Sequence, residues 1–275
     1  MPGSGVKGGG ILLIGAGRMG GALLKGWIAE GIAPLIAVEP KPSKELKALA
    51  KKHRVRLLGD VCELPKAKVA ACIIAIKPQV LKDAAPTLKS IAESGATMIS
   101  IAAGTTTKSL AKAWGDNARI VRSMPNTPGA IGRGITAIYA TPKATAKDRK
   151  LADKLLSALG KTVWVKKEEL IDAATAVSGS GPAYVFLLVE AMTDAGIKEG
   201  LPSDVAAKLA RQTVSGAGAL LDAEKTSPAE LRRNVTSSGG TTEAALNVLM
   251  APDGLPKLMQ RAVNAARKRA RALGR

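Results

Sequence analysis

Histidine, cysteine and aromatic side chains are scarce in this chain, and their scarcity argues against several kinds of chemistry. The 275 residues include one histidine, two cysteines and 2% aromatic residues. His53 lies among cations at positions 51–54, which is typical of a solvated helix end and not of a general base. Cys62 and Cys72 have neither the spacing of metal ligands nor that of a disulfide framework. A histidine-based hydrolase or dehydrogenase and a zinc site are therefore poorly supported.

The chain also lacks long apolar runs. None reaches the roughly 18 residues that span a bilayer, and the glycine-rich residues 1–10 lack the apolar core of a signal peptide. We expect residues 1–10 to be a flexible tail. With 46% hydrophobic and 23% charged residues, the composition is that of a soluble protein of one large or two moderate domains. We expect a cytoplasmic location and no membrane partner.

Charge is unbalanced, with a formal net charge of +19, which raises the hypothesis of nucleic-acid binding. The basic residues are spread along the chain, however, with one dense cluster at 267–271. The few aromatic residues provide almost no platform for stacking bases, and no DNA-binding motif is present. We therefore expect no nucleic-acid partner. The positive charge is more typical of an enzyme that attracts anionic substrates and cofactors.

Short apolar runs alternate with helical patterns up to about residue 165. The apolar runs predict strands at 11–14, 35–38, 55–58, 70–76, 97–101, 119–122, 135–140 and 162–165. Helical patterns fill residues 18–30 and 147–159, and another helix opens at Ser43. Apolar strands separated by helices are typical of an α/β domain with a mostly parallel sheet that is covered on both faces. We assign this domain to residues 11–165.

Strand signals stop after residue 165, and residues 166–275 are predicted to form an all-helical domain. Pro182, Pro202 and Pro228 each suit the first turn of a helix. The helices around 185–192 and 206–221 carry more hydrophobic surface than a small helical domain needs. Burial of this surface between subunits would make the protein a homo-oligomer.

A glycine motif directly follows the first predicted strand. Gly15, Gly17 and Gly20 form the pattern G-x-G-x-x-G at the opening of the first helix. The first glycine allows a tight turn, the second lets a pyrophosphate approach the backbone, and the third lets the helix pack closely on the strand. The strand–turn–helix context favours dinucleotide binding over a purely structural turn. It predicts a doubly wound Rossmann domain.

The residues after the second predicted strand bear on the choice of cofactor. Glu39 stands where a carboxylate binds the ribose 2′-hydroxyl, which favours NAD(H). Lys41, Ser43 and Lys44 follow at once and suit the 2′-phosphate of NADP(H). A turn with a helix N-cap at Ser43 is compatible with both. The sequence therefore leaves NADP(H) and NAD(H) as alternatives.

Polar turns follow three further predicted strands, at residues 77–79, 102–104 and 124–128. The carboxyl ends of the strands in a doubly wound sheet face the ligand crevice. Each of these segments alone could be a simple turn. Together they predict the walls of a nicotinamide site.

The run 234–242 combines hydroxyls and glycines before a helical pattern. Ser237, Thr241 and Thr242 can donate hydrogen bonds, and Gly239 and Gly240 let the backbone turn sharply. Free N–H groups at a helix start suit a small carboxylate. The alternative is a Ser/Thr/Gly loop with an ordinary N-cap.

Three segments carry a resemblance to pyrroline-5-carboxylate reductase that extends over nearly the whole chain after the tail. They are the turn at 124–128, the segment Ser-Gly-Ser-Gly-Pro-Ala-Tyr at 178–184, and the run 234–242. The resemblance implies a Rossmann domain followed by a helical dimerisation domain, in homodimers that often assemble into decamers. It also implies NAD(P)H-dependent reduction of 1-pyrroline-5-carboxylate to L-proline, the final step of proline synthesis.

The resemblance assigns roles by position. The residues that it places on the cofactor are Gly15, Gly17, Arg18, Met19, Gly20, Lys77, Pro78, Ala102, Met124, Asn126 and Asn234. Glu39 joins them from its place after the second predicted strand. The residues that it places on the substrate are Ser237, Gly240, Thr241 and Glu168, with Thr242 as the catalytic residue at the ring nitrogen. One position departs from the family, since Ser238 stands where proline is usual. Proline presets φ, so we expect a more flexible loop here, with its donor groups intact.

Two alternatives stay open. One is a related Rossmann reductase of another small imino or keto acid. The β-hydroxyacid dehydrogenases, for example, rely on a lysine of the helical domain, for which Lys198 and Lys208 are the candidates. The other is a non-catalytic nucleotide- or nucleic-acid-binding module, against which the intact pair Thr241 and Thr242 counts.

Overall fold

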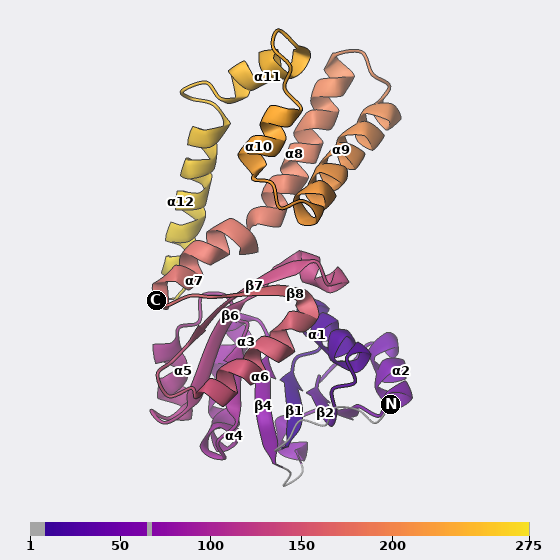
Figure 1. Ribbon diagram of the computed structural model, residues 1–275. Coiled ribbons are helices and arrows are strands. Elements are labelled where there is room, and N and C mark those ends of the chain that lie inside the picture. Colours follow the sequence, from indigo (N-terminus) through magenta and orange to yellow (C-terminus); the bar gives the residue numbers. More distant parts are fainter. Residues whose placement is uncertain (1–8, 65–67, 275) are drawn as a thin grey trace. The chain divides into compact units, whose positions relative to one another are not determined.

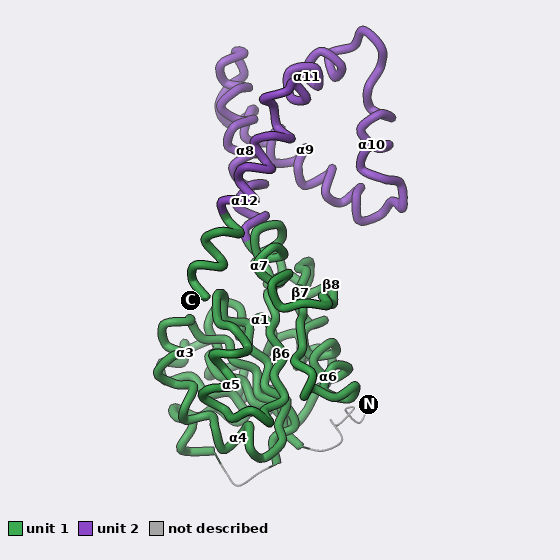
Figure 2. Tube along the Cα trace, turned by 90° about the vertical axis from the view of Figure 1, so that its left-hand side faces the viewer, with its two compact units in different colours: residues 1–179, 266–275 green, residues 180–265 purple. Residues whose placement is uncertain are grey.

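The computed structural model describes residues 9–64 and 68–274 and divides them into two compact units. Unit 1 comprises residues 1–179 and 266–275, and unit 2 comprises residues 180–265 (Figure 2). Most of the predicted tail lies outside the described residues, and Gly10 already belongs to the first strand. The division falls at 179/180, fourteen or so residues beyond the predicted boundary near 165.

Within the described residues, unit 1 is built on an eight-stranded sheet of order β3-β2-β1-β4-β5-β6-β7-β8 (Figure 1). The pairing of β6 with β7 is antiparallel, and the other pairs are parallel. The predicted mostly parallel, doubly wound sheet is thus confirmed. The strands are β1 (Gly10–Ile14), β2 (Leu35–Val38), β3 (Arg56–Leu58), β4 (Val69–Ile74), β5 (Thr97–Ser100), β6 (Arg119–Met124), β7 (Gly134–Ala140) and β8 (Gly160–Trp164).

Helices cover both faces of this sheet, which is why its central strands β1, β2 and β4 are apolar. Ile11 and Leu13 of β1 face one core, and Leu12 and Ile14 face the other. Trp27 belongs to the first core and donates a hydrogen bond to the Leu155 carbonyl at 2.7 Å. The helices of unit 1 are α1 (Arg18–Ala29), α2 (Lys44–Lys52), α3 (Pro78–Ala84), α4 (Lys89–Glu93), α5 (Thr107–Trp114), α6 (Ala146–Leu156) and α7 (Glu169–Ala174).

Two packing contacts explain why unit 1 extends beyond the predicted boundary. Helix α7 is bound to the sheet through ion pairs from Arg122 of β6 to Glu168 and Asp172. At the other end of the chain, Leu273 packs against Gly104, where an added Cβ would lie 2.8 Å from the Leu273 Cβ. A boundary drawn at the last strand signal misses both contacts, because they join segments far apart in the sequence.

In its described residues, unit 2 is helical, as predicted. Its helices are α8 (Gly181–Lys198), α9 (Ser203–Ala223), α10 (Pro228–Asn234), α11 (Thr241–Leu249) and the first part of α12 (Leu255–Leu273). Pro182 and Pro228 lie in first turns, whereas Pro202 is one residue earlier than predicted, at the N-cap of α9. Phe186 and Leu187 of α8 are 59% and 62% exposed.

Two classes of feature are missing from the described part of the chain. No helix there combines the length and the hydrophobicity that crossing a membrane requires. The His, Cys, Asp and Glu side chains of the same residues form no group of three that could hold a metal ion.

Asp148 is a buried carboxylate at the amino ends of the strands. Its oxygens accept hydrogen bonds from the Thr97 hydroxyl at 2.6 Å and from the Thr145 hydroxyl and N–H at 2.7 and 2.8 Å, with Arg119 at 3.6 Å. Burial alone would raise the pKa of this carboxyl. The hydrogen bonds from Thr97 and Thr145 and the charge of Arg119 outweigh that effect, so the pKa lies below its usual value of 3.8.

We predict that Asp148 contributes to acid stability. Its folded pKa is depressed, so its contribution is present above the unfolded pKa of 3.8 and is lost as the pH falls through the lower folded value. Asp148→Asn should lower the free energy of unfolding at pH 7 by about 1–3 kcal/mol. It should also flatten the pH dependence below pH 4. Urea unfolding between pH 7 and pH 3 measures both effects, and parallel pH profiles of the two proteins would contradict the assignment.

Candidate cofactor and substrate sites

The glycine turn between β1 and α1 has the shape that its sequence predicts. Gly15 has φ +87°, and a Cβ there would lie 2.6 Å from Ile76 Cγ2. A Cβ on Gly20 would lie 2.0 Å from the Gly15 carbonyl oxygen. At Gly17, by contrast, nothing lies within 4 Å of the added atom. The first and third glycines are therefore needed for packing, and the second leaves open space for a ligand.

This open space lies at the N-terminus of α1. Among the described residues, no side chain caps this helix. The N–H groups of Arg18 and Met19 in its first turn are therefore available to a ligand, at the positive end of the helix dipole. Free space at Gly17, beside uncapped backbone N–H groups, fits a pyrophosphate.

Glu39 connects the end of β2 to the glycine turn. One carboxylate oxygen accepts the Ala16 N–H at 2.9 Å, and the other accepts the Lys41 N–H at 3.3 Å. Ser43 caps α2 by accepting the Leu46 N–H at 3.1 Å, so the N-cap interpretation of Ser43 is confirmed. Glu39 thus lies next to the candidate pyrophosphate site, and its residual lone pairs are available to a ribose.

A pocket of about 260 Å³ opens at the carboxyl ends of the next strands. Its lining includes five of the residues predicted for the cofactor, which are Met19, Pro78, Ala102, Met124 and Asn126. Lys77 is exposed at the N-cap of α3 and does not line the pocket. The sequence prediction missed four residues of this wall, which are Ala75, Ile76, Ile101 and Gly179. Gly179 belongs to the segment 178–184 that carried the family resemblance, so that segment could have pointed to it.

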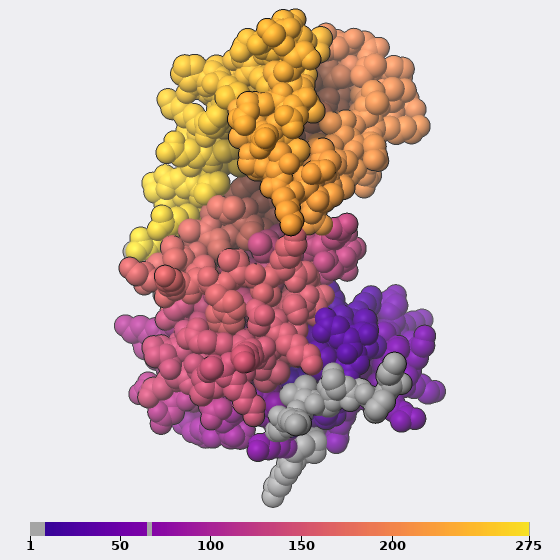
Figure 3. All heavy atoms as spheres, in the orientation of Figure 1, coloured from indigo at the N-terminus to yellow at the C-terminus, as the bar shows by residue number. Residues whose placement is uncertain are grey.

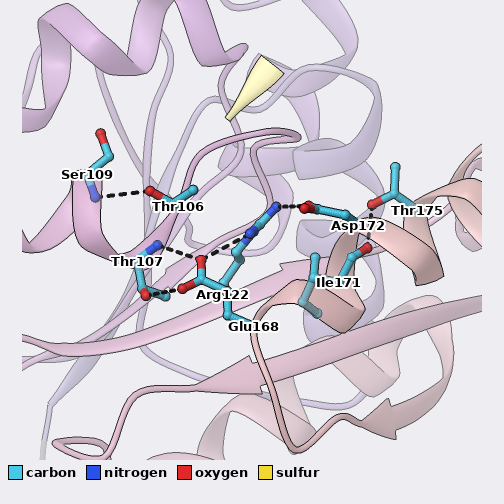
Figure 4. A network of polar contacts seen from close by, with 8 residues as sticks. All are labelled: Thr106, Thr107, Ser109, Arg122, Glu168, Ile171, Asp172 and Thr175. Atoms are coloured by element: carbon cyan, nitrogen blue, oxygen red, sulfur yellow. Dashed lines mark hydrogen bonds and ion pairs between the residues drawn. The ribbon is translucent and has the colours of Figure 1, made fainter. Parts of the chain in front are cut away.

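A polar network joins β6 to the starts of α5 and α7 (Figure 4). The Arg122 guanidinium binds Glu168 at 3.0 Å and Asp172 at 2.8 Å. Glu168 also accepts the Thr107 N–H at 2.7 Å and the Thr107 hydroxyl. Both carboxylate oxygens of Glu168 are thus engaged, so direct substrate binding by this residue would require it to release these partners. Arg122 was not singled out in the sequence.

The run 234–242 forms a turn between two helices at the surface of unit 2 (Figure 3, orange to gold). The Gly240 N–H donates to the Ser237 carbonyl at 3.1 Å, with Ser238 and Gly239 at the centre of the turn. Gly239 has φ +72°, whereas the φ of Ser238 is not positive. This combination is a type II turn, whose second position favours proline. Ser238 therefore occupies the turn position that proline suits.

Hydroxyl groups follow this turn at the start of α11. In the part of the chain that the structure describes, the hydroxyls of Ser237, Thr241 and Thr242 have no hydrogen-bond partner, and no side chain caps α11 at Gly240. The neighbouring Glu243 instead accepts the Gly239 N–H at 2.7 Å. Asn234 is the last residue of α10 and is exposed. The loop thus presents free donors to a small anion, and the N-cap alternative receives no support from the hydroxyls.

Gly17 and Gly20 yield a paired prediction. Gly17→Ala should fold like the wild type, because φ is −66° and the added carbon has free space. It should weaken NADPH binding by about tenfold or more, because it blocks hydrogen bonds to a charged ligand. Gly20→Ala should instead lower stability by about 1–3 kcal/mol through overpacking. Thermal unfolding and fluorescence titration with NADPH separate the two, and equal melting temperatures would refute this distinction.

The turn yields a second prediction. Ser238→Pro should raise the free energy of unfolding of the helical unit by about 0.4–1 kcal/mol, because proline restricts the unfolded chain. It should also lower the KM for a carboxylate substrate by ordering the turn. Ser238→Ala serves as the control that removes the hydroxyl without fixing φ. A loss of stability in the proline variant would show that the turn is not type II.

Comparisons with known proteins agree with this geometry. Residues 168–273 match the family model "Pyrroline-5-carboxylate reductase dimerisation", and residues 10–104 match "NADP oxidoreductase coenzyme F420-dependent". Pyrroline-5-carboxylate reductases from Pseudomonas aeruginosa and from Synechocystis sp. are each 40% identical, over 96% of this chain and 96–97% of theirs.

Solved structures of the same family are also similar. The reductase from Coxiella burnetii is 35% identical, with a TM-score of 0.89 over 97% of this chain and 99% of that one. The NADP-bound pyrroline carboxylate reductase from Plasmodium falciparum is 28% identical, with a TM-score of 0.80 over 97% and 98%. The resemblance seen in the sequence is therefore confirmed, and this chain belongs to the pyrroline-5-carboxylate reductase family.

Proposed function

We propose that this protein reduces 1-pyrroline-5-carboxylate to L-proline with NAD(P)H, the final step of proline synthesis. The observation that carries this proposal is the loop at Ser237, Thr241 and Thr242, whose hydroxyls are free at the uncapped start of α11. It occurs in a chain that also has a fitting dinucleotide turn and relatives named for this reaction at 40% identity.

The cofactor site accounts for one half of the reaction. When bound, NAD(P)H supplies the hydride that the imine carbon accepts. Gly15, Gly17, Gly20, Arg18 and Met19 hold the pyrophosphate, and Glu39 lies at the ribose beyond. Pro78, Ala102, Met124 and Asn126 shape the wall of the pocket that orients the nicotinamide end. Lys77 and Asn234 remain proposals by resemblance alone.

The loop accounts for the other half. The hydroxyls of Ser237 and Thr241 and the backbone N–H groups at Gly240 and beyond bind the substrate carboxylate, while the Thr242 hydroxyl holds the ring nitrogen. A protonated imine is already electrophilic, so the protein needs mainly to align the reacting atoms. This requirement agrees with a chain that has one histidine.

The assembly that we propose is a homodimer, and its further association into decamers follows from the resemblance alone. Support comes from the dimerisation model over residues 168–273 and from the apolar side chains that α8 and α9 expose. Phe186, Leu187 and Leu209 are each more than half exposed, as expected for a surface that a second copy covers. We propose the cytoplasm as its compartment, in agreement with two free cysteines.

The alternative chemistries have little support in the structure. Lys198 is the exposed last residue of α8, and Lys208 is paired with Asp204 at 3.4 Å on the surface of α9. Neither has the buried setting that a catalytic lysine needs.

Two loop variants test the proposed function. Thr242→Ala should lower kcat by about 10²-fold, because it removes the donor at the ring nitrogen. Ser237→Ala should mainly raise the KM for pyrroline-5-carboxylate by about tenfold, since one bond to the carboxylate is lost. Initial rates of NADPH and NADH oxidation, with proline identified as the product, give both constants.

Thr236→Val is the matched control in the same loop. Its hydroxyl is already used, since it donates to the Arg232 carbonyl at 2.6 Å, and the variant should retain the wild-type kcat. Wild-type kinetics in both Thr242→Ala and Ser237→Ala would remove the loop from the reaction.

A further inference from the structure

The ion-pair network of Arg122, Glu168 and Asp172 sets two carboxylates against one cation. The Arg122 side chain is 4% exposed, on a strand where its neighbours Ile120 and Val121 are buried as well. Burying a guanidinium is costly unless its donors are matched by charged acceptors. Glu168 and Asp172 provide two carboxylates for this single cation. Apolar side chains of similar volume often stabilise a fold as well as a buried ion pair does. Stability alone therefore does not account for this network, and we ask which segments it connects.

Each partner in the network belongs to a segment that continues into the pocket wall. Thr107 opens α5, directly after the loop 102–106 that includes Ala102. Arg122 lies two residues before Met124, at the end of β6. Asp172 lies on α7, which runs into the π-helical turn Thr175–Gly179. The network therefore joins three segments, each of which also contributes a residue to the lining of the pocket.

The three segments also meet at the pocket itself. Gly179 lies against Met124, since an added Cβ would come within 2.9 Å of the Met124 Cε. Ala102, Met124 and Gly179 all line the pocket. A shift of α7 or of the loop 102–106 would therefore change the shape of this wall directly.

We propose that Arg122, Glu168, Asp172 and Thr107 are positioning residues that set the wall of the nicotinamide end of the cofactor site. The proposal rests on the proposed dinucleotide function and assigns Glu168 a role other than substrate contact. Glu168 is the central member, because it binds Arg122 and both polar groups of Thr107. Hydrogen bonds to a charged acceptor are strong and directional, so they fix α7 relative to the loop.

Glu168→Ala is the informative variant, because Asp172 continues to pair with Arg122 and no cation is left alone. The experiment compares two ligands that share the adenosine end and differ at the nicotinamide end. These are NADPH and 2′-phospho-ADP-ribose, or NADH and ADP-ribose. Calorimetric titration should show about a tenfold rise in the Kd for the complete cofactor and less than a twofold change for the truncated ligand.

Asp148→Asn is the matched control. Asp148 is also a carboxylate that binds an arginine and threonine hydroxyls. Its partners are Thr97 on β5, Arg119 on β6 and Thr145 at the N-cap of α6, and it lies at the opposite, amino ends of the strands. It should lower the melting temperature without changing the ratio of the two dissociation constants. Glu168→Gln keeps the size and an acceptor oxygen, and should restore part of the cofactor affinity. Thr107→Val, which loses one bond to Glu168, should show a smaller effect in the same direction.

The outcomes separate this proposal from the proposed function. A wild type that binds NADPH but does not reduce pyrroline-5-carboxylate would overturn the function, while the binding ratio would still test the network. Equal weakening of both ligands in Glu168→Ala, or of neither, would overturn the positioning role. A rise confined to the KM for pyrroline-5-carboxylate, with unchanged NADPH binding, would overturn it too and would return Glu168 to the substrate.

Discussion

The contact between α1 and β1 is the constraint on which the cofactor site depends. Only a hydrogen atom fits at Gly20, because the Gly15 carbonyl oxygen lies where a Cβ would be. This closeness brings the uncapped N-terminus of α1 to the carboxyl end of β1, with the open space at Gly17 beside it. Since β1 lies between β2 and β4, Glu39 comes to one side of the turn and the pocket wall to the other. A dinucleotide needs this arrangement of pyrophosphate site, ribose acceptor and nicotinamide wall.

The two units supply different chemistry. Unit 1 holds the proposed dinucleotide elements and an internal ion-pair network that joins the segments of the pocket wall. Unit 2 holds a type II turn and a helix start with free hydroxyls, which suit a carboxylate. Catalysis of hydride transfer to an imine needs alignment more than it needs a strong acid or base. A chain poor in histidine and without a metal-binding motif in its sequence is therefore adequate for this reaction.

Features that depend on local sequence could be predicted, and features that depend on distant contacts could not. The apolar run at 35–38 coincides with β2, and the glycine spacing specified the turn before α1. The antiparallel pairing of β7 with β6 was not predicted, although the short connection between them, without an α-helix, is the local signal for it. Arg122 sits in an apolar strand, and its partners lie 46 and 50 residues away, so nothing nearby reveals them. For the same reason the unit boundary lies beyond the last strand. Among the predicted site residues, Lys77 stays a prediction: its neighbours Ile76 and Pro78 line the pocket, whereas Lys77 itself does not.

The most direct test of the account is to trace the hydride. The purified protein would be incubated with pyrroline-5-carboxylate and NADPH, or NADH, that carries two deuterium atoms at nicotinamide carbon 4, so that transfer from either face delivers deuterium. The product would be analysed by NMR. The account predicts L-proline with one deuterium at carbon 5, the former imine carbon. Cofactor oxidation that leaves carbon 5 of proline unlabelled, or a folded protein that binds both cofactors and forms no proline, would contradict it.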